Sequence, residues 1–275
     1  MSICLSAVYI DCMRSITTTD NFIDKLATLV QKKRPGWEGL DDHVHSLAPL
    51  ELTSNADVVR ILPTLSGDQL YAAIEVVGVL ELRRAGPILV PFMESHDTHL
   101  LWCAQRALSD MASRRTYRPL ARIAATHPDV ETQYQACYAI SWTHDRAAAP
   151  ILLELYCRSD LPPRVRGQAA EGLANTLGYT DRRRRIFRQS AAALIQGLRD
   201  DSAEVRFWSA FALGQMHARQ ASPELARVVA EDTAFCPGWW YVHEEASDAL
   251  GHIRGVDVPD RDCLGWTETG EPRVP

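Results

Sequence analysis

Apolar residues recur along this chain three or four positions apart, in runs separated by short polar segments. That spacing places them on one side of a helix, so each run predicts an amphipathic helix. Glycine, proline and aspartate fill the intervals, as at Gly86-Pro87 and Pro162-Pro163, and predict the turns. The expected helices run through Val58, Ile61 and Leu62, through Leu70, Ile74 and Val77, and over residues 88–93, 100–111, 117–125, 132–142, 150–157, 165–177, 186–198, 205–216, 223–230 and 242–253.

Every second one of these helices contains a short seam of small and apolar residues. The seam recurs at intervals of roughly 30 to 40 residues, a period that indicates an array of structural repeats. Each repeat buries its apolar face only by stacking on its neighbours, so one array needs no second core. The seams are Glu75–Gly78, Arg106–Ser109, Tyr138–Ser141, Glu171–Ala174, Phe211–Gly214 and Asp248–Gly251.

The ends of the chain differ from the array. Two helices, one after Thr19-Asp20 and one over residues 41–52, predict an N-terminal helical capping region at 1–54. The repeat array is expected at 55–253. Prolines and alternating charges after it predict an extended C-terminal tail at 254–275.

The stretch Asp201–Gly214 joins an aspartate, a Val-Arg pair, two small residues and a final Ala-Leu-Gly. In this it resembles the HEAT repeat in its phycobilisome-lyase-like variety, and residues 163–174 and 242–251 are similar. The resemblance covers roughly residues 55–253 and implies an all-α fold, a right-handed α-α superhelix (a HEAT-like solenoid) of about six helical pairs. It is specific for the fold and weak for activity.

The resemblance also implies that the Val-Arg helices are the inner ones, lining a concave face into which their variable positions point. Aligning the repeats on their seams brings aromatic residues into those positions, where an interaction surface uses large rigid rings with polar rims. An alternative stays open, in which some of the rings cover neighbouring helices and belong to the core. The candidate partner-binding residues of this face are Tyr71, Glu75, Trp102, Arg106, Tyr134, Tyr138, Phe207, Trp208 and Phe211.

Two repeats are longer than the others. The first insertion contains Arg182–Arg185, and the second contains Trp239-Trp240. Insertions in solenoids map to loops on one side of the array. We therefore expect Arg183, Arg184, Trp239 and Trp240 to act as clamps at one edge of the binding face. For the arginines, a solvated loop is the competing interpretation.

The composition of the chain limits the classes of partner and the compartment that we expect. The 275 residues carry a net charge of −6, which argues against binding nucleic acid across the whole surface. No apolar run approaches the length that spans a bilayer. Seven cysteines without a CxxC pair favour core thiols in a reducing compartment, so a cytoplasmic protein is expected.

Enzymatic activity is not expected. His243-Glu244 is the one pair of the kind that builds the iron site of deoxyhypusine hydroxylase, and the equivalent positions elsewhere lack such pairs. Trp102, Trp142, Trp208 and Asp145 match the residue types of alkylpurine DNA glycosylases, but acidic residues stand among them. That activity is kept as a minor alternative. No cofactor and no metal site are predicted.

The sequence thus predicts a protein-binding scaffold or adaptor that captures a partner protein on its concave aromatic face. A narrower alternative is an immunity protein that neutralises a bacterial toxin by covering its active site. The sequence does not identify the partner or the oligomeric state.

Overall fold

The computed structural model describes residues 21, 23–24, 27–28, 55–258, 261–265 and 273. It divides into two compact units, the first ending at Thr116 and the second beginning at Tyr117, and each is described by itself. The predicted capping region at 1–54 lies almost wholly outside the described residues and stays a prediction.

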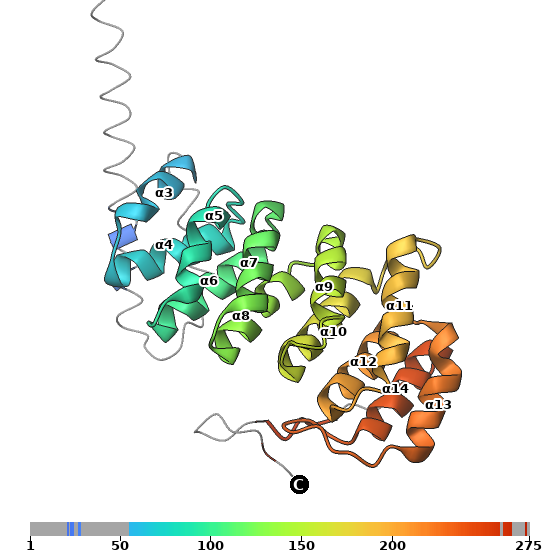
Figure 1. Cartoon of the computed structure of the whole chain (residues 1–275). Coiled ribbons are helices and arrows are strands. Elements are labelled where there is room, and N and C mark those ends of the chain that lie inside the picture. Colours follow the sequence, from blue (N-terminus) through green and yellow to red (C-terminus); the bar gives the residue numbers. More distant parts are fainter. Residues whose placement is uncertain are drawn as a thin grey trace, which may run out of the picture. The chain divides into compact units, whose positions relative to one another are not determined.

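The described part of the chain is built of helices (Figure 1). Its only strand-like feature is an isolated bridge between Phe235 and Tyr241. The α-helices are α3 (Asn55–Ile61), α4 (Gly67–Val79), α5 (Gly86–Leu89), α6 (Thr98–Met111), α7 (Arg114–Thr126), α8 (Val130–Ser141), α9 (Ala149–Tyr156), α10 (Pro163–Leu177), α11 (Arg185–Gly197), α12 (Ala203–Gln215), α13 (Ser222–Glu231) and α14 (Val242–Arg254). Four 3-10 turns are η1 (Leu62–Thr64), η2 (Val90–Glu94), η3 (Arg146–Ala148) and η4 (Arg219–Ala221).

These elements form the six helical pairs that the apolar pattern predicts within residues 55–254, and the predicted fold class is confirmed. The ends of several helices follow from local chemistry. The side chains of Asp97 and Asp129 accept hydrogen bonds from backbone amides at the starts of α6 and α8. The helix expected at 88–93 is instead the short α5 followed by η2, because Pro91 has no amide to donate and interrupts the helical ladder.

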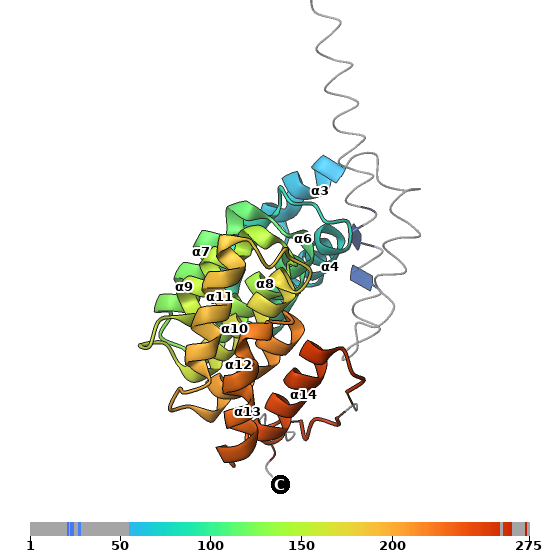
Figure 2. The ribbon, with the colours of Figure 1, turned by 90° about the vertical axis from the view of Figure 1, so that its right-hand side faces the viewer.

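In the second unit the helices form two layers. The inner helices α8, α10, α12 and α14 pack each against the next, while α9, α11 and α13 pack on them from one side (Figure 2). The inner helices run parallel. Cys137 Sγ donates to the Val165 carbonyl and, about one turn further along both helices, Ser141 Oγ donates to the Gln168 carbonyl. Contacts between α12 and its two neighbours likewise advance in the same direction along both helices.

The seam of small residues is where neighbouring inner helices touch. A Cβ added to Gly214 would lie 2.7 Å from Ala249 Cα, and one added to Gly172 would lie 2.4 Å from Ser141 Oγ. Small side chains are therefore needed for the close approach of the helices. This contact is the physical reason for the recurring motif.

Candidate functional site

One surface of the second unit collects most of the candidate residues. On each inner helix, a set of positions three or four residues apart lies on the side away from the outer helices. Most of these side chains are partly or fully exposed, and three of them, Gln168, Glu245 and Asp248, are buried. We call this surface the inner face. Its members, in equivalent positions of the four repeats, are Glu131, Arg164, Glu204 and Tyr241; Gln135, Gln168, Trp208 and Glu245; Tyr138, Glu171, Phe211 and Asp248; and Trp142, Asn175, Gln215 and His252.

A ladder of rings lies along α8 at one end of the inner face. The Tyr134 and Tyr138 ring centroids are 6.2 Å apart, and Trp142 stacks on Tyr138 at 5.7 Å with an interplanar angle of 27°. Trp142 remains 37% exposed. The predicted residues Tyr134 and Tyr138 are thus brought together on an accessible surface, and Trp142 extends the ladder.

A second aromatic cluster joins α12 to the loop before α14. Trp208 contacts Phe211 at 5.4 Å and Trp239 at 5.1 Å, and Trp240 lies 5.8 Å from Trp239. Phe207 lies beneath these rings and is only 1% exposed, so the expectation that it is an open ring of the groove is wrong. Phe207 anchors the cluster, and its neighbours present the surface.

The first unit holds the remaining predicted residues. Tyr71 is 9% exposed, packs edge-on against His99 and hydrogen-bonds to Asp97, so it too is a core ring and not an open one. Trp102 on α6, by contrast, is 56% exposed.

The two charged candidates of the first unit form a pair across α4 and α6. The buried carboxylate of Glu75 accepts from Arg106 Nη2 at 2.5 Å. Arg106 and Trp102 lie one turn apart on α6. The exposed ring of Trp102 therefore lies next to an arginine whose charge is balanced by Glu75.

Carboxylates stand among the rings of the inner face. Glu171 accepts from Gln168 Nε2 at 2.7 Å, and burial raises its pKa. Burial also raises the pKa of Glu204, although the charge of Arg164 acts in the opposite sense. Glu245 is 4% exposed and accepts from Trp240 Nε1 at 3.0 Å. Its burial, reinforced by the charge of Asp248, raises its pKa to about 8.

The inner face also carries two arginines, and both are ion-paired. Arg164 Nη1 lies 2.7 Å from Glu131 Oε2, with the guanidinium carbon 4.2 Å from the Tyr134 ring centroid. Arg261, from the C-terminal segment, bonds to Asp248 through two nitrogens and lies 3.2 Å from Glu244. Neither cation is left over to attract a phosphate.

The two insertions do not lie at one edge of the face. Arg183 and Arg184 are exposed and follow the C-terminal end of the inner helix α10. Trp239 and Trp240 precede the N-terminal end of the inner helix α14. Because the inner helices are parallel, these ends are opposite. The expectation of two clamps at a single edge is therefore wrong.

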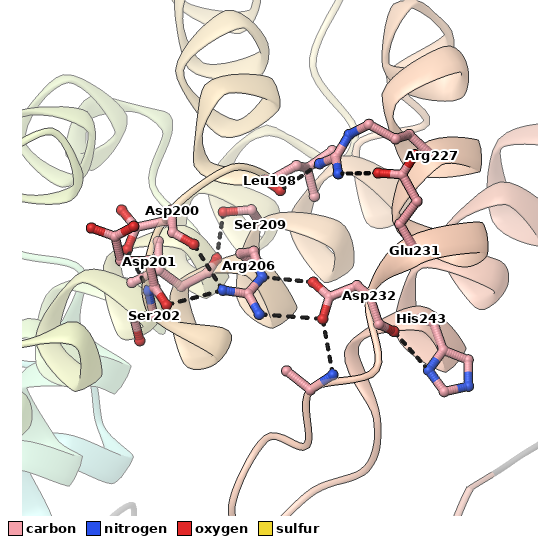
Figure 3. A network of polar contacts seen from close by, with 12 residues as sticks. Leu198, Asp200, Asp201, Ser202, Arg206, Ser209, Arg227, Glu231, Asp232 and His243 are labelled. Carbon is pink, nitrogen blue, oxygen red and sulfur yellow. Dashed lines mark hydrogen bonds and ion pairs between the residues drawn. The ribbon is translucent and has the colours of Figure 1, made fainter.

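The arginine of the Val-Arg motif has a structural partner at this N-terminal edge (Figure 3). Arg206 Nε and Nη2 bond to the two carboxylate oxygens of Asp232 at 2.6 and 3.2 Å, and Arg206 Nη1 donates to the Asp200 carbonyl at 2.8 Å. Arg166 Nη2 bonds to Asp200 Oδ2 at 2.7 Å in the same way. Each arginine thus ties its repeat to the next. A hollow of about 570 Å³ beside this network is lined by charged groups that bond to one another.

Sequence reasoning missed four contributors to the inner face, namely Trp142, Arg164, Glu204 and Glu245. Trp142 and Glu204 each lie a helical turn beyond the aligned positions, and the 3.6-residue period carried one turn further would have included them. Glu245 stands in an aligned column with Gln135, Gln168 and Trp208, and no local feature of the sequence marks its burial. The pairing of Arg164 with Glu131 joins neighbouring repeats through residues far apart in sequence, so it leaves no local signal.

Two features of the described residues bear on other functions. Within residues 55–258 and the other described positions, no group of three or more His, Cys, Asp or Glu side chains is placed to hold a metal ion. None of the described helices is both long enough and apolar enough to cross a membrane.

In a comparison with known families, residues 151–236 match the family described as HEAT repeats. A comparison with curated proteins gave no match. Fold and family match together define a helical repeat protein. The match over residues 151–236 agrees with the resemblance to HEAT repeats that residues 163–174 and 201–214 carry.

Solved structures of similar fold include the karyopherin Kap121p bound to the extreme C-terminus of the protein phosphatase Cdc14p. The two share 14% identity with a TM-score of 0.54, over 88% of this chain and 30% of the karyopherin. A designed armadillo repeat protein in complex with the peptide (KR)4 is 17% identical, with a TM-score of 0.45 over 73% of this chain and 100% of that one. The complex of CpcE and CpcF of phycocyanin lyase from Nostoc is 19% identical, with a TM-score of 0.42 over 73% and 77%. The likeness to the karyopherin concerns the fold alone, which is that of a helical repeat solenoid.

Proposed function

We propose that this protein is a non-enzymatic scaffold that captures a partner protein on the inner face of its second unit. One observation carries the proposal. Large rings that packing does not fully cover, those of Tyr138, Trp142, Trp208 and Phe211, gather on one surface of four parallel helices. Exposed aromatic surface rimmed by polar groups is the composition of a protein-binding site.

The surroundings of the rings fit the same role. Trp208 packs against Gly167, where an added Cβ would be 2.6 Å from Trp208 Cδ1, so the ring is in close contact with the backbone of α10. A ring fixed before binding loses little conformational entropy when a partner covers it. Trp239 and Trp240 extend the surface at its N-terminal edge, and Arg183 and Arg184 flank its other edge, as contacts for a large partner.

The charges of the inner face favour a protein partner over DNA. Both arginines of the inner face are engaged by carboxylates, whereas a DNA-binding groove presents cations to the phosphates. We therefore do not carry the glycosylase alternative further. The immunity function is a narrower version of this proposal, in which the captured protein is a toxin and the rings cover its active site.

The proposal is tested by capturing the partner from the native host on immobilised protein. The variants are Trp142→Ala and Trp208→Ala, each checked for folding by circular dichroism. Tyr179→Ala is the matched control, because Tyr179 is a fully exposed ring on the turn between α10 and α11. Removing a central ring from an interface costs about 2 kcal/mol or more, roughly a thirtyfold loss of affinity.

Gly167→Ala gives an independent route to the same surface. The added methyl group displaces the Trp208 ring without deleting it, and the expected result is again weaker capture. The proposal fails if the folded Trp142→Ala and Trp208→Ala variants capture the same protein as strongly as Tyr179→Ala does. Co-expression with the captured partner, scored as rescue of growth, then decides whether that partner is a toxin.

A further inference from the structure

The charges of the inner face do not balance. Five of its members carry carboxyl groups, namely Glu131, Glu171, Glu204, Glu245 and Asp248, and two arginines, Arg164 and Arg261, lie beside them. Because burial raises the pKa of Glu245 to about 8, four of the five are the charged ones at neutral pH. Those arginines pair with Glu131, Glu244 and Asp248. Among the described residues, no cation lies within ion-pair distance of Glu171 or Glu204.

These two carboxylates are held at a cost to the fold. Both are partly buried, and burial raises the pKa of each because it disfavours the charged form. A glutamine at either position would have the same shape without that cost. Retaining an acid there is explained if a cation from outside the chain completes the site.

The inner face already shows how it holds a guanidinium group. Arg164 lies over the ring of Tyr134 while its nitrogen bonds to Glu131, so a ring and a carboxylate grip it together. The carboxylates of Glu171 and Glu204, which have no ion pair within the described part of the chain, also have aromatic rings as neighbours. Glu171 lies between Tyr138 on α8 and Phe211 on α12, at the equivalent position of the neighbouring repeats. Glu204 precedes Trp208 by one turn of α12.

We propose that the partner segment captured by the inner face is an extended peptide rich in arginine and lysine, with one cationic side chain at Glu171 and another at Glu204. This inference rests on the proposed function and names the chemistry of its partner. The two carboxylates stand on adjacent helices, about 10 Å apart laterally and about 10 Å apart along the helix axes. The direct span of about 14 Å corresponds to about four residues of extended chain. The cationic side chains therefore sit about four positions apart in the partner.

The test measures binding of fluorescently labelled octa-arginine by anisotropy, with octa-glutamate and a neutral Gly-Ser octapeptide for comparison. The double variant Glu171→Gln/Glu204→Gln removes the two unpaired carboxylates. Its matched control, Glu154→Gln/Glu231→Gln, removes the same charge from exposed sites on the outer helices α9 and α13. The wild type binds octa-arginine and neither of the other peptides, and rising salt weakens the complex. The inner-face variant binds at least tenfold more weakly, and the control changes less than twofold.

Loss of folding does not explain such a result, because a neutral glutamine removes a charge whose burial is unfavourable. Equal octa-arginine binding by the two double variants would overturn the inference. The capture experiment separates it from the proposed function. If Trp142→Ala abolishes capture of the native partner and Glu171→Gln/Glu204→Gln leaves it intact, the scaffold function stands and the cationic partner is refuted. If neither change affects capture, both are refuted.

Discussion

The carboxyl group of Glu245 gives a quantitative prediction about stability. It lies on α14 with 4% of its surface exposed, accepts one hydrogen bond from Trp240 and has Asp248 one turn further along. Burial is the main cause that raises its pKa from 4.5 to about 8, and the Asp248 charge adds to it. In the folded protein Glu245 is therefore protonated at neutral pH.

The sign of the pH effect follows from comparing folded and unfolded chains. Below pH 4.5 both hold the proton, and the full contribution of Glu245 to stability is present. As the pH rises toward 8 the unfolded chain loses the proton while the folded chain keeps it, so stability falls. At about 1.4 kcal/mol per pKa unit, the loss is about 3 kcal/mol at pH 7 and about 4 kcal/mol at pH 8, where half of the folded molecules have also lost the proton.

The variant Glu245→Gln removes this dependence. Glutamine keeps the volume and an oxygen acceptor for Trp240 but has no charge to bury. We expect the variant to match the wild type near pH 4.5 and to exceed it by a few kcal/mol near pH 8. The measurement is urea unfolding of both proteins across this range, followed by circular dichroism.

Glu244→Gln serves as the control. Glu244 is the adjacent residue, partly exposed, and its carboxylate lies 3.2 Å from Arg261. Losing such a pair should change stability by less than about 1 kcal/mol throughout the range. A constant difference between Glu245→Gln and the wild type from pH 4.5 to 8 would show that Glu245 is charged in the folded protein, and would refute the argument.

Two further substitutions test the packing and the repeat ties. Gly214→Val places a branched side chain where a Cβ would lie 2.7 Å from Ala249 Cα, and we expect the separation of α12 from α14 to cost about 2 kcal/mol or more in thermal or urea unfolding; an unchanged midpoint would contradict it. Asp232→Asn breaks the paired bonds to Arg206, with an expected loss of about 3 kcal/mol at pH 7. Although burial opposes ionisation of Asp232, the Arg206 bonds hold its pKa below 3.8, so the wild type should lose this advantage as the pH falls below that value. A difference that persists at pH 2 would contradict the assignment.

The positions of the helices could be predicted because their signals are local. Apolar periodicity and turn residues placed a helix at 150–157, and the structure has α9 at Ala149–Tyr156. Proline at the start of α9 and α10 and aspartate before α8 reinforce the same boundaries. The repeat period could be recognised from the small residues of the seam, because the close contact between inner helices requires small residues at those positions.

The exposure of individual rings could not be predicted, because it depends on contacts between distant segments. Phe207 stands on the flank of α12, and what covers it is the loop carrying Trp239 and Trp240 more than a helix away in sequence. Tyr71 is covered in the same manner by the Asp97 region. Neighbouring positions of the same helix, such as Trp208, keep an open side. A shift of one residue, about 100° around the helix, separates core from surface.

Charge is used in two separate ways by this molecule, and that separation makes its function testable. At the N-terminal edge, Arg166 and Arg206 pair with aspartates of the following repeat, so removing a charge there should lower stability. On the inner face, Glu171 and Glu204 have no such partner within the described residues, so neutralising them should leave stability equal or higher while binding is lost. Where a substitution would stabilise the fold and the chain nevertheless keeps the less stable residue, function opposes stability. A Glu171→Gln/Glu204→Gln protein that unfolds at lower urea concentration than the wild type would place these carboxylates among the structural charges instead.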